Sequence, residues 1–292
     1  MNRPPLGGHG FGLRVPHYAE ILARGVRAEL AEALTENFLG RGGRARAVLE
    51  RLRRDIPITL HGVSLSIGST DPLSERYLSS LVELCERCEP ALVSDHLCFG
   101  TVGGRRAYDL WPLPYTEEAL AHVVQRVAVV QERLGRQICL ENVSSYVEYR
   151  ASALREWEFL SAVAEQADCL ILLDVNNVFV SAHNHGFSAD DYLAALPRSR
   201  VAQLHLAGHR DCGAYLLDDH GSPVSEAVWE LYRQVLRRFG PLPTILEWDE
   251  NVPSLTELEA ECDRARAVEQ ELERSAANEE IGRASCRERV CG

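Results

Sequence analysis

The sequence predicts a (β/α)8 barrel, also called a TIM barrel. Eight short apolar runs alternate with eight helical segments along the 292 residues, and about 250 residues is the usual size of such a barrel. Most of the runs end in or near a histidine or a carboxylate. No G-x-G-x-x-G motif follows the first run, which argues against the alternative, an open doubly wound sheet that binds nucleotides. We expect one domain over residues 1–275.

The first four strands are expected in the N-terminal third of the chain. The second ends in Glu36 and Asn37, the third in His61 and the fourth in His96. Gly62 follows His61 and permits a tight exit from the third strand. The strands are predicted over residues 10–15, 34–38, 56–62 and 91–96, and the helices after the first three over 17–27, 45–53 and 74–87.

The other four strands also carry carboxylates or a histidine. A continuous apolar run is typical of a strand that is buried on both faces. Glu141, Asp174 and Glu247 stand at or near the ends of three of these runs, and His205 lies in the fourth. The strands are predicted over residues 138–141, 169–174, 201–206 and 244–249, and the helices over 120–134, 155–166, 189–196, 223–239 and 255–274.

These polar side chains indicate a metal site. The C-terminal ends of all strands in a barrel meet at one face, and gathering so many titratable groups there is costly unless cations neutralise them. Imidazole and carboxylate suit borderline or hard divalent ions, and a carboxylate can bridge two ions. The predicted ligands of a metal pair, with Glu141 central, are His61, His96, Glu141, Asp174, His205 and Glu247. A third, more weakly held ion is predicted at Asn177, Asp218 and His220.

The charge and the basic residues exclude several classes of protein. A net charge of −12 argues against binding to nucleic acid, which needs a clustered positive surface. All 31 basic residues are arginine. Schiff-base chemistry, pyridoxal phosphate and the P-loop are therefore excluded, because each needs a lysine.

The distribution of apolar residues and cysteines predicts a cytoplasmic protein. No apolar run is long enough to span a membrane, and the N-terminus has no signal segment. The nine cysteines are scattered, so we expect them to be reduced. Cys85 and Cys88 form a C-x-x-C, but they lie in a helical pattern without a second pair and are not expected to bind metal.

Seven motifs occur in one order along the chain, at residues 60–66, 94–97, 140–143, 173–177, 184–186, 205–209 and 247–249. Together they resemble the multinuclear non-haem iron-dependent oxidases, the family that includes the oxidase of methanobactin biosynthesis. The resemblance covers residues 10–258. It departs from the family pattern at His183, where an aromatic residue is common, and at Asp219, where threonine is common. These departures concern substrate contact, and His183 is expected in a loop.

The resemblance implies a barrel of the xylose-isomerase-like type that uses two or three iron ions and dioxygen. Manganese or zinc can occupy such a site in purified protein. The implied activity is oxidation of a residue, often cysteine, in a ribosomally made precursor peptide. A small partner protein encoded nearby would present the peptide. Glu141, Asp174 and His205 are the expected catalytic residues.

Two other enzyme classes and one inactive form remain as alternatives. The three-zinc apurinic endonucleases share the barrel, but they would have a histidine where this chain has Asn177, and a phosphodiesterase needs a basic rim to hold DNA. A metal-dependent sugar isomerase or epimerase usually has fewer histidines. A barrel that binds without catalysis is the third alternative.

The rim of the barrel is expected to recognise the peptide and the partner protein. Arginine and aromatic residues anchor many interfaces. The predicted docking surfaces are residues 209–222 and residues 99–115, which include Arg105, Arg106, Tyr108 and Trp111. Residues 276–292 show no useful periodicity and are expected to be a disordered or non-native tail.

Overall fold

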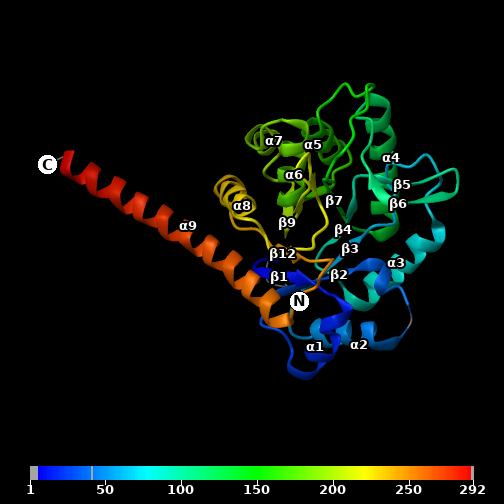
Figure 1. The fold of residues 1–292 in the computed structure, drawn as a ribbon, viewed down its shortest axis with the longest axis horizontal. Coiled ribbons are helices and arrows are strands. Elements are labelled where there is room, and N and C mark those ends of the chain that lie inside the picture. Colours follow the sequence, from blue (N-terminus) through cyan, green and yellow to red (C-terminus); the bar gives the residue numbers. More distant parts are fainter. Residues whose placement is uncertain (1–5, 41, 291–292) are drawn as a thin grey trace.

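Eight parallel strands form a closed barrel, which confirms the predicted TIM-barrel fold (Figure 1). The computed structural model describes residues 6–40 and 42–290. The barrel strands follow one another around the barrel in chain order. They are β1 (His9–Gly12), β2 (Leu30–Leu34), β3 (Ile58–Gly62), β4 (Val93–His96), β7 (Cys139–Glu141), β8 (Leu170–Asp174), β9 (Val201–Ala207) and β12 (Thr244–Glu247).

Helices cover the outside of the barrel and pack on it through one continuous apolar core. Hydroxyl groups cap several of them, as at α3, where Ser74 Oγ accepts a hydrogen bond from the Tyr77 N–H. No helix in the described ranges has the length and apolar character that crossing a membrane requires. The outer helices are α1 (Tyr18–Arg24), α2 (Gly43–Leu52), α3 (Glu75–Cys88), α4 (Glu117–Leu134), α5 (Glu156–Gln166), α7 (Ala189–Ala195), α8 (Glu226–Phe239) and α9 (Leu255–Val290), and the 3-10 turn η1 (Val15–His17) precedes α1.

The second strand lies earlier in the chain than the sequence predicted. It is β2, and the residues predicted as a strand form instead the 3-10 turn η2 (Thr35–Asn37). Ala31 and Ala33 are buried in the core, and Glu32 faces the barrel interior with 3% of its surface exposed. Because the Glu32 carboxylate interrupts a run of small residues, this segment has no continuous apolar run that would predict a strand.

A helix that the sequence did not predict, α6 (Val175–His185), begins directly at the end of β8. Asp174 Oδ1 accepts a hydrogen bond from the Asn177 N–H at 2.6 Å and caps this helix. Val175 and Val178 bury its inner face. The loop expected at His183 is therefore wrong, since His183 lies in the last turn of α6.

Two hairpins project from the rim of the barrel. The predicted docking segment 99–115 forms β5 (Phe99–Val102) and β6 (Arg105–Trp111), and the segment 209–222 contains the short strands β10 (Arg210–Asp211) and β11 (Leu216–Leu217). Asp71 fastens the first turn, since its two carboxylate oxygens accept hydrogen bonds from the Gly103 and Gly104 N–H groups at 2.8 and 2.9 Å.

The C-terminal segment continues helix α9 instead of lacking regular structure. Val268 and Leu272 pack on the core, and beyond them Figure 1 shows the helix continuing away from the barrel to Val290. Residues 276–290 are rich in alanine, glutamate and arginine, which favour helix without any apolar periodicity. The remainder of the predicted tail, residues 291–292, lies outside the described residues.

Glu156 at the start of α5 makes stability depend on pH. It accepts a hydrogen bond from the Tyr192 hydroxyl at 2.9 Å, and burial raises its pKa from 4.5 to about 7. The folded protein therefore retains a proton that the unfolded chain has released, and stability falls as pH rises through this range. Glu156→Gln keeps an acceptor for the Tyr192 hydroxyl, and because glutamine does not titrate, it removes the loss of stability at high pH.

We expect Glu156→Gln to unfold with a free energy about 1–2 kcal/mol higher than the wild type at pH 8. At pH 5 the difference should be much smaller. Urea unfolding at the two pH values measures both, and an equal difference at pH 5 and pH 8 would contradict this role for Glu156.

Candidate metal centre

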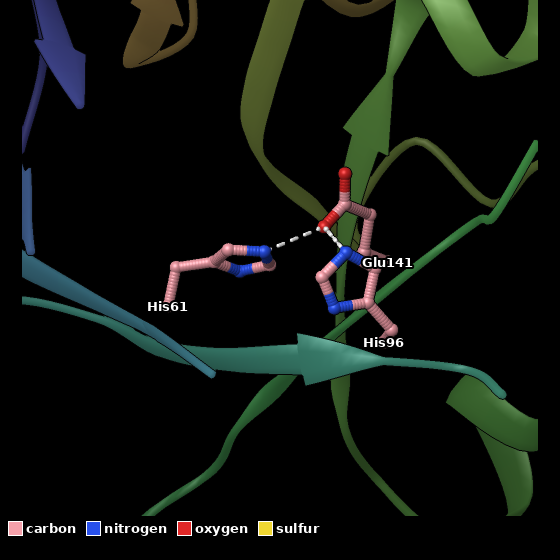
Figure 2. A group of neighbouring side chains, drawn as sticks. All are labelled: His61, His96 and Glu141. Carbon is pink, nitrogen blue, oxygen red and sulfur yellow. Dashed lines mark ion pairs between the residues drawn. The ribbon is translucent and has the colours of Figure 1, made fainter. Parts of the chain in front are cut away.

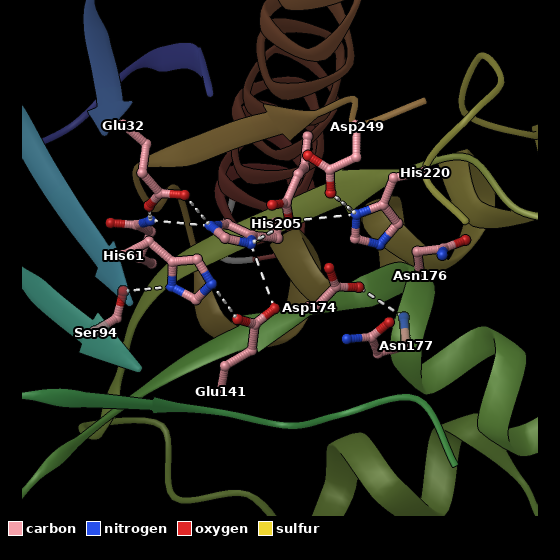
Figure 3. A network of polar contacts seen from close by, with 12 residues as sticks. Glu32, His61, Ser94, Glu141, Asp174, Asn176, Asn177, His205, His220 and Asp249 are labelled. Carbon is pink, nitrogen blue, oxygen red and sulfur yellow. Dashed lines mark hydrogen bonds and ion pairs between the residues drawn. The ribbon is translucent and has the colours of Figure 1, made fainter. Parts of the chain in front are cut away.

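The six predicted ligands of the metal pair meet at the C-terminal end of the barrel. Figure 3 shows His61, Glu141, Asp174 and His205 of this set. Each of the six lies on a different barrel strand, and no more than 9% of any of these residues is exposed. Together they contribute three imidazoles and three carboxylates, and they are His61 on β3, His96 on β4, Glu141 on β7, Asp174 on β8, His205 on β9 and Glu247 on β12.

The Glu141 carboxylate lies at the centre of the cluster. Its Oε2 atom lies 3.0 Å from His61 Nε2 and 3.2 Å from His96 Nε2 (Figure 2). Its other oxygen, Oε1, lies 3.4 Å from His205 Nδ1. One carboxylate therefore faces two histidines with one oxygen and a third with the other, which is the arrangement of a bridging ligand.

A second group of side chains lies on the His205 side of Glu141. Glu247 Oε2 is 3.1 Å from His205 Nδ1 and 3.6 Å from His220 Nδ1. Ligand atoms of Glu141, Asp174, His205 and Glu247 all lie within 4.8 Å of one another. These four residues could hold one ion, and His61, His96 and Glu141 another.

The residues predicted for a third ion lie beside this pair. His220 Nε2 is 2.7 Å from Asp218 Oδ1. Asn177 Nδ2 donates a hydrogen bond to the Asn142 carbonyl at 2.9 Å, so its Oδ1 remains available. The structure adds Asp249, whose Oδ2 lies 3.2 Å from His220 Nδ1 and which groups with His220 and Glu247. Asp249 ends the predicted eighth strand and lies in the motif at residues 247–249, but the sequence analysis did not include it among the predicted ligands.

Two buried ligand atoms have no partner within the described part of the chain, and this supports a bound cation. Asp174 Oδ2 and Asn177 Oδ1 form no hydrogen bond there, and Asp174 forms no ion pair. Buried polar atoms normally find a partner. The set of nitrogen and oxygen atoms without thiolate fits iron, manganese or zinc. Four further atoms have contacts only with other members of the cluster: His61 Nε2, Glu141 Oε2, His205 Nδ1 and His220 Nε2.

The outer nitrogen of each central histidine has a partner that orients the ring. His61 Nδ1 lies 2.8 Å from Ser94 Oγ, and His96 Nδ1 lies 3.0 Å from the Gly62 carbonyl oxygen. His205 Nε2 lies 2.9 Å from Glu32 Oε1. In each ring the other nitrogen faces the cluster, as in metal sites where a second group holds the ligand in one tautomer.

Glu32 is a functional residue that the sequence analysis missed. Its Oε2 atom accepts hydrogen bonds from Thr59 Oγ1 at 3.1 Å and from Gln203 Nε2 at 2.5 Å, while Oε1 faces His205. The buried carboxylate thus has a partner at each oxygen. Glu32 lies between the predicted helix over residues 17–27 and the predicted strand over residues 34–38, so no predicted element contained it.

The pKa values of Asp174 and His61 both depend on the neighbouring Glu141 carboxylate. Burial, followed by the nearby Glu141 carboxylate, raises the pKa of Asp174 well above its usual value. Burial lowers the pKa of His61, but the Glu141 carboxylate outweighs it and brings the pKa to about 9. Without a cation, protons must balance these charges, and a bound divalent ion would replace them.

A cavity of about 400 Å³ opens above the cluster. His61, His96, His220 and Glu247 line its floor side, and Tyr146 lies in its wall. A peptide side chain can therefore reach the ligands from the rim.

The motif at residues 184–186 contributes to the structure of the rim and not to the ligand cluster. Asn184 exchanges two hydrogen bonds with Leu216 of β11, at 2.8 and 3.0 Å.

Glu32→Gln should weaken metal binding although Glu32 is not a ligand. An amide cannot hold the His205 ring as the carboxylate does, and loss of such a partner typically costs 10–100-fold in metal affinity. Competition with a chromogenic chelator measures this. Glu156→Gln, the same substitution at a partly buried site outside the ligand cluster, should bind metal as the wild type does. Equal affinity in both variants would contradict the role of Glu32.

Sequence comparisons identify relatives along nearly the whole chain. A family model described as RiPP precursor modification enzyme MbnB/TglH/ChrH matches residues 8–270. A UPF0276 protein from Anaeromyxobacter sp. (strain Fw109-5) is 64% identical over 262 residues, which cover 90% of this chain and 93% of that protein. A UPF0276 protein from Acaryochloris marina (strain MBIC 11017) is 51% identical over 258 residues, with coverages of 88% and 93%.

Solved structures share the fold. Endonuclease IV from Thermus thermophilus superposes with a TM-score of 0.59 at 18% identity, covering 90% of this chain and 99% of that one. D-psicose 3-epimerase from Clostridium cellulolyticum H10, solved with D-tagatose, gives a TM-score of 0.59 at 13% identity, with coverages of 90% and 98%. These matches show the shared barrel fold and nothing about the reaction. The family match over residues 8–270 and the relatives at 64% and 51% identity show that the chain belongs to the MbnB/TglH/ChrH family of RiPP precursor modification enzymes.

Proposed function

We propose that this protein is a multinuclear iron, dioxygen-dependent oxidase that modifies cysteine in a ribosomally made precursor peptide. Membership of a family of precursor-modifying enzymes supports the peptide substrate. The observation that carries the chemistry is the Glu141 carboxylate, whose two oxygens face histidines on both sides within 3.4 Å. Such a bridge suits two ions that act on one substrate.

The residues of the chain fit two ions and a third beside them. His61, His96 and Glu141 would hold one ion. Asp174, His205 and Glu247 would hold the second with Glu141 as the bridge. A third ion would lie at Asn177, Asp218, His220 and Asp249. When bound, ferrous iron supplies dioxygen activation, and a metal also favours ionisation of a coordinated thiol.

The protein residues provide the environment for this reaction. The barrel wall buries the ligands, so water reaches them only through the mouth cavity. Loss of the hydrogen on the carbon beside sulfur and of the thiol hydrogen would remove two electrons and two protons from cysteine and leave a carbon–sulfur double bond. Dioxygen would accept these two electrons and two protons and leave as hydrogen peroxide. Burial and the Glu141 carboxylate favour the protonated form of Asp174, so this side chain could hold one proton within the site.

We further propose that a small partner protein docks on the hairpin β5–β6. Val102 and Trp111 of this hairpin are 55% and 39% exposed. Exposed aliphatic and aromatic side chains on a projecting hairpin are suited to an interface. The hairpin lies at the mouth, where a bound partner could present the peptide to the metal centre.

Glu141→Ala should remove most of the bound metal, because it deletes the ligand shared by the ions. Elemental analysis after anaerobic reconstitution with ferrous iron measures the loss. Glu156→Gln serves as the folded control and should retain the wild-type content. Full retention of metal in Glu141→Ala would contradict a central bridge.

Turnover of a cysteine-containing precursor should require both iron and dioxygen. Mass spectrometry of the peptide after incubation in air and under argon tests this requirement. We expect modification in air only. Undiminished modification under argon would rule out an oxidase. Metal-dependent cleavage of abasic DNA or epimerisation of a ketose under argon would instead favour the functions of the structural neighbours.

A further inference from the structure

The cavity above the metal centre continues along the hairpin β5–β6. Val63, Asp109 and Leu110 line both this cavity and a second one of about 430 Å³. The second cavity in turn shares lining residues, among them Ser64 and Arg106, with a third of about 1030 Å³. The three cavities therefore lie next to one another along the hairpin, from the metal centre to the outer rim, and we call them together the hairpin groove.

The walls of the hairpin groove are already held in place. Ser66 Oγ accepts a hydrogen bond from the Gly100 N–H at 2.8 Å, and Ser69 Oγ donates one to the Thr101 carbonyl at 2.6 Å. With the contacts of Asp71 to the hairpin turn, these bonds tie the hairpin to the loop after β3. A ligand would enter a preformed groove and would not have to order it.

The outer part of the groove is lined by three arginines that have no carboxylate ion pair among the described residues. Arg126 is partly buried and donates to the carbonyls of Ser66, Ile67 and Asp71 at 3.2, 2.7 and 2.8 Å. Arg106 donates to Ser64 Oγ at 2.7 Å and is exposed. The third is Arg76, which is exposed. Neutral oxygens accept from Arg106 and Arg126, so their positive charges are not neutralised by contact.

The carboxylates of the same region already have donors. Glu36 Oε1 accepts from the Val63 N–H at 3.1 Å and from the Tyr77 hydroxyl at 2.8 Å. Both oxygens of Asp71 accept from the hairpin turn. Of the four carboxylate oxygens of Glu36 and Asp71, only the buried Glu36 Oε2 has no hydrogen-bond donor among the described residues. An incoming cation would have to compete for the other three, whereas an incoming carboxylate would find the exposed guanidinium groups of Arg76 and Arg106. The chemistry of the outer groove therefore favours an anionic ligand, although the chain as a whole is acidic.

We propose that the hairpin groove binds the precursor peptide in an extended form and holds an acidic side chain of that peptide at Arg76 and Arg106. The serine and threonine hydroxyls of the walls can bond the peptide backbone. Because the groove leads to the ligands, the acidic anchor would place a cysteine at the metal centre. This inference rests on the proposed peptide substrate and adds the feature that the enzyme selects in it.

Peptide binding to metal-free protein tests the groove apart from the reaction. The probes are fluorescein-labelled synthetic peptides that carry one cysteine, a short Gly-Ser spacer and either Glu-Asp-Glu or Gln-Asn-Gln. Fluorescence anisotropy at low salt should show at least tenfold tighter binding of the acidic peptide. The double variant Arg76→Glu/Arg106→Glu should lose this preference and bind a Lys-Arg-Lys peptide instead.

A matched control carries the same change of charge elsewhere. Arg54 and Arg198 are exposed and precede β3 and β9, at the opposite end of the barrel. Arg54→Glu/Arg198→Glu should keep the preference for the acidic peptide. Arg106→Gln, a milder change, should weaken acidic-peptide binding several-fold, and thermal unfolding confirms that each variant is folded.

Two results would overturn the proposal: binding of the acidic and neutral peptides within twofold of each other, or an equal loss in the control double variant. Neither result tests the proposed oxidase activity, since this assay uses no metal and no dioxygen. Conversely, selective binding of the acidic peptide by a protein that never oxidises cysteine would retain the groove and refute the oxidase.

Discussion

The burial of the Glu141 carboxylate among three imidazoles and two further acids is the constraint on which the site depends. Charged groups lose favourable hydration when they enter the interior, and each must be compensated by a partner. Protons compensate part of this charge, because burial and the Glu141 carboxylate favour a protonated Asp174, and Glu141 also favours a protonated His61. Divalent cations would compensate all of these groups at once and would supply a partner for Asp174 Oδ2 and Asn177 Oδ1, which have none among the described residues.

Strand register produces this arrangement directly. His96 on β4 pairs with Glu141 on β7, and Asp174 on β8 pairs with His205 on β9. Parallel neighbours in register place their side chains side by side at one end of the barrel. The bridge therefore follows from strand pairing and needs no unusual loop. Glu32 lies further inside the barrel, where it pairs in register with Thr59, two residues before His61. Its carboxylate contacts His205 Nε2 on the side of the ring that faces away from Glu141.

The sequence predicted the barrel and the six converging side chains because apolar runs that end in polar residues are visible in one dimension. It did not predict Glu32, since an inward carboxylate inside a strand looks the same as one in a loop. Helix α6 was missed because its capping residue, Asp174, had been assigned only to the strand. Contacts between rim segments, such as Asp249 with His220 or Arg106 with Ser64, depend on folding of distant loops and leave no local pattern.

The hairpin groove and the metal centre would act as one site, with recognition at the outer rim and chemistry at Glu141. Anomalous diffraction at the iron absorption edge tests the central claim most directly, on crystals prepared with ferrous iron in the absence of oxygen. We predict two or three iron peaks within bonding distance of the cluster, two of them sharing Glu141 as a ligand. The absence of iron between His61, Glu141 and His205, or iron bound only elsewhere on the protein, would contradict the account.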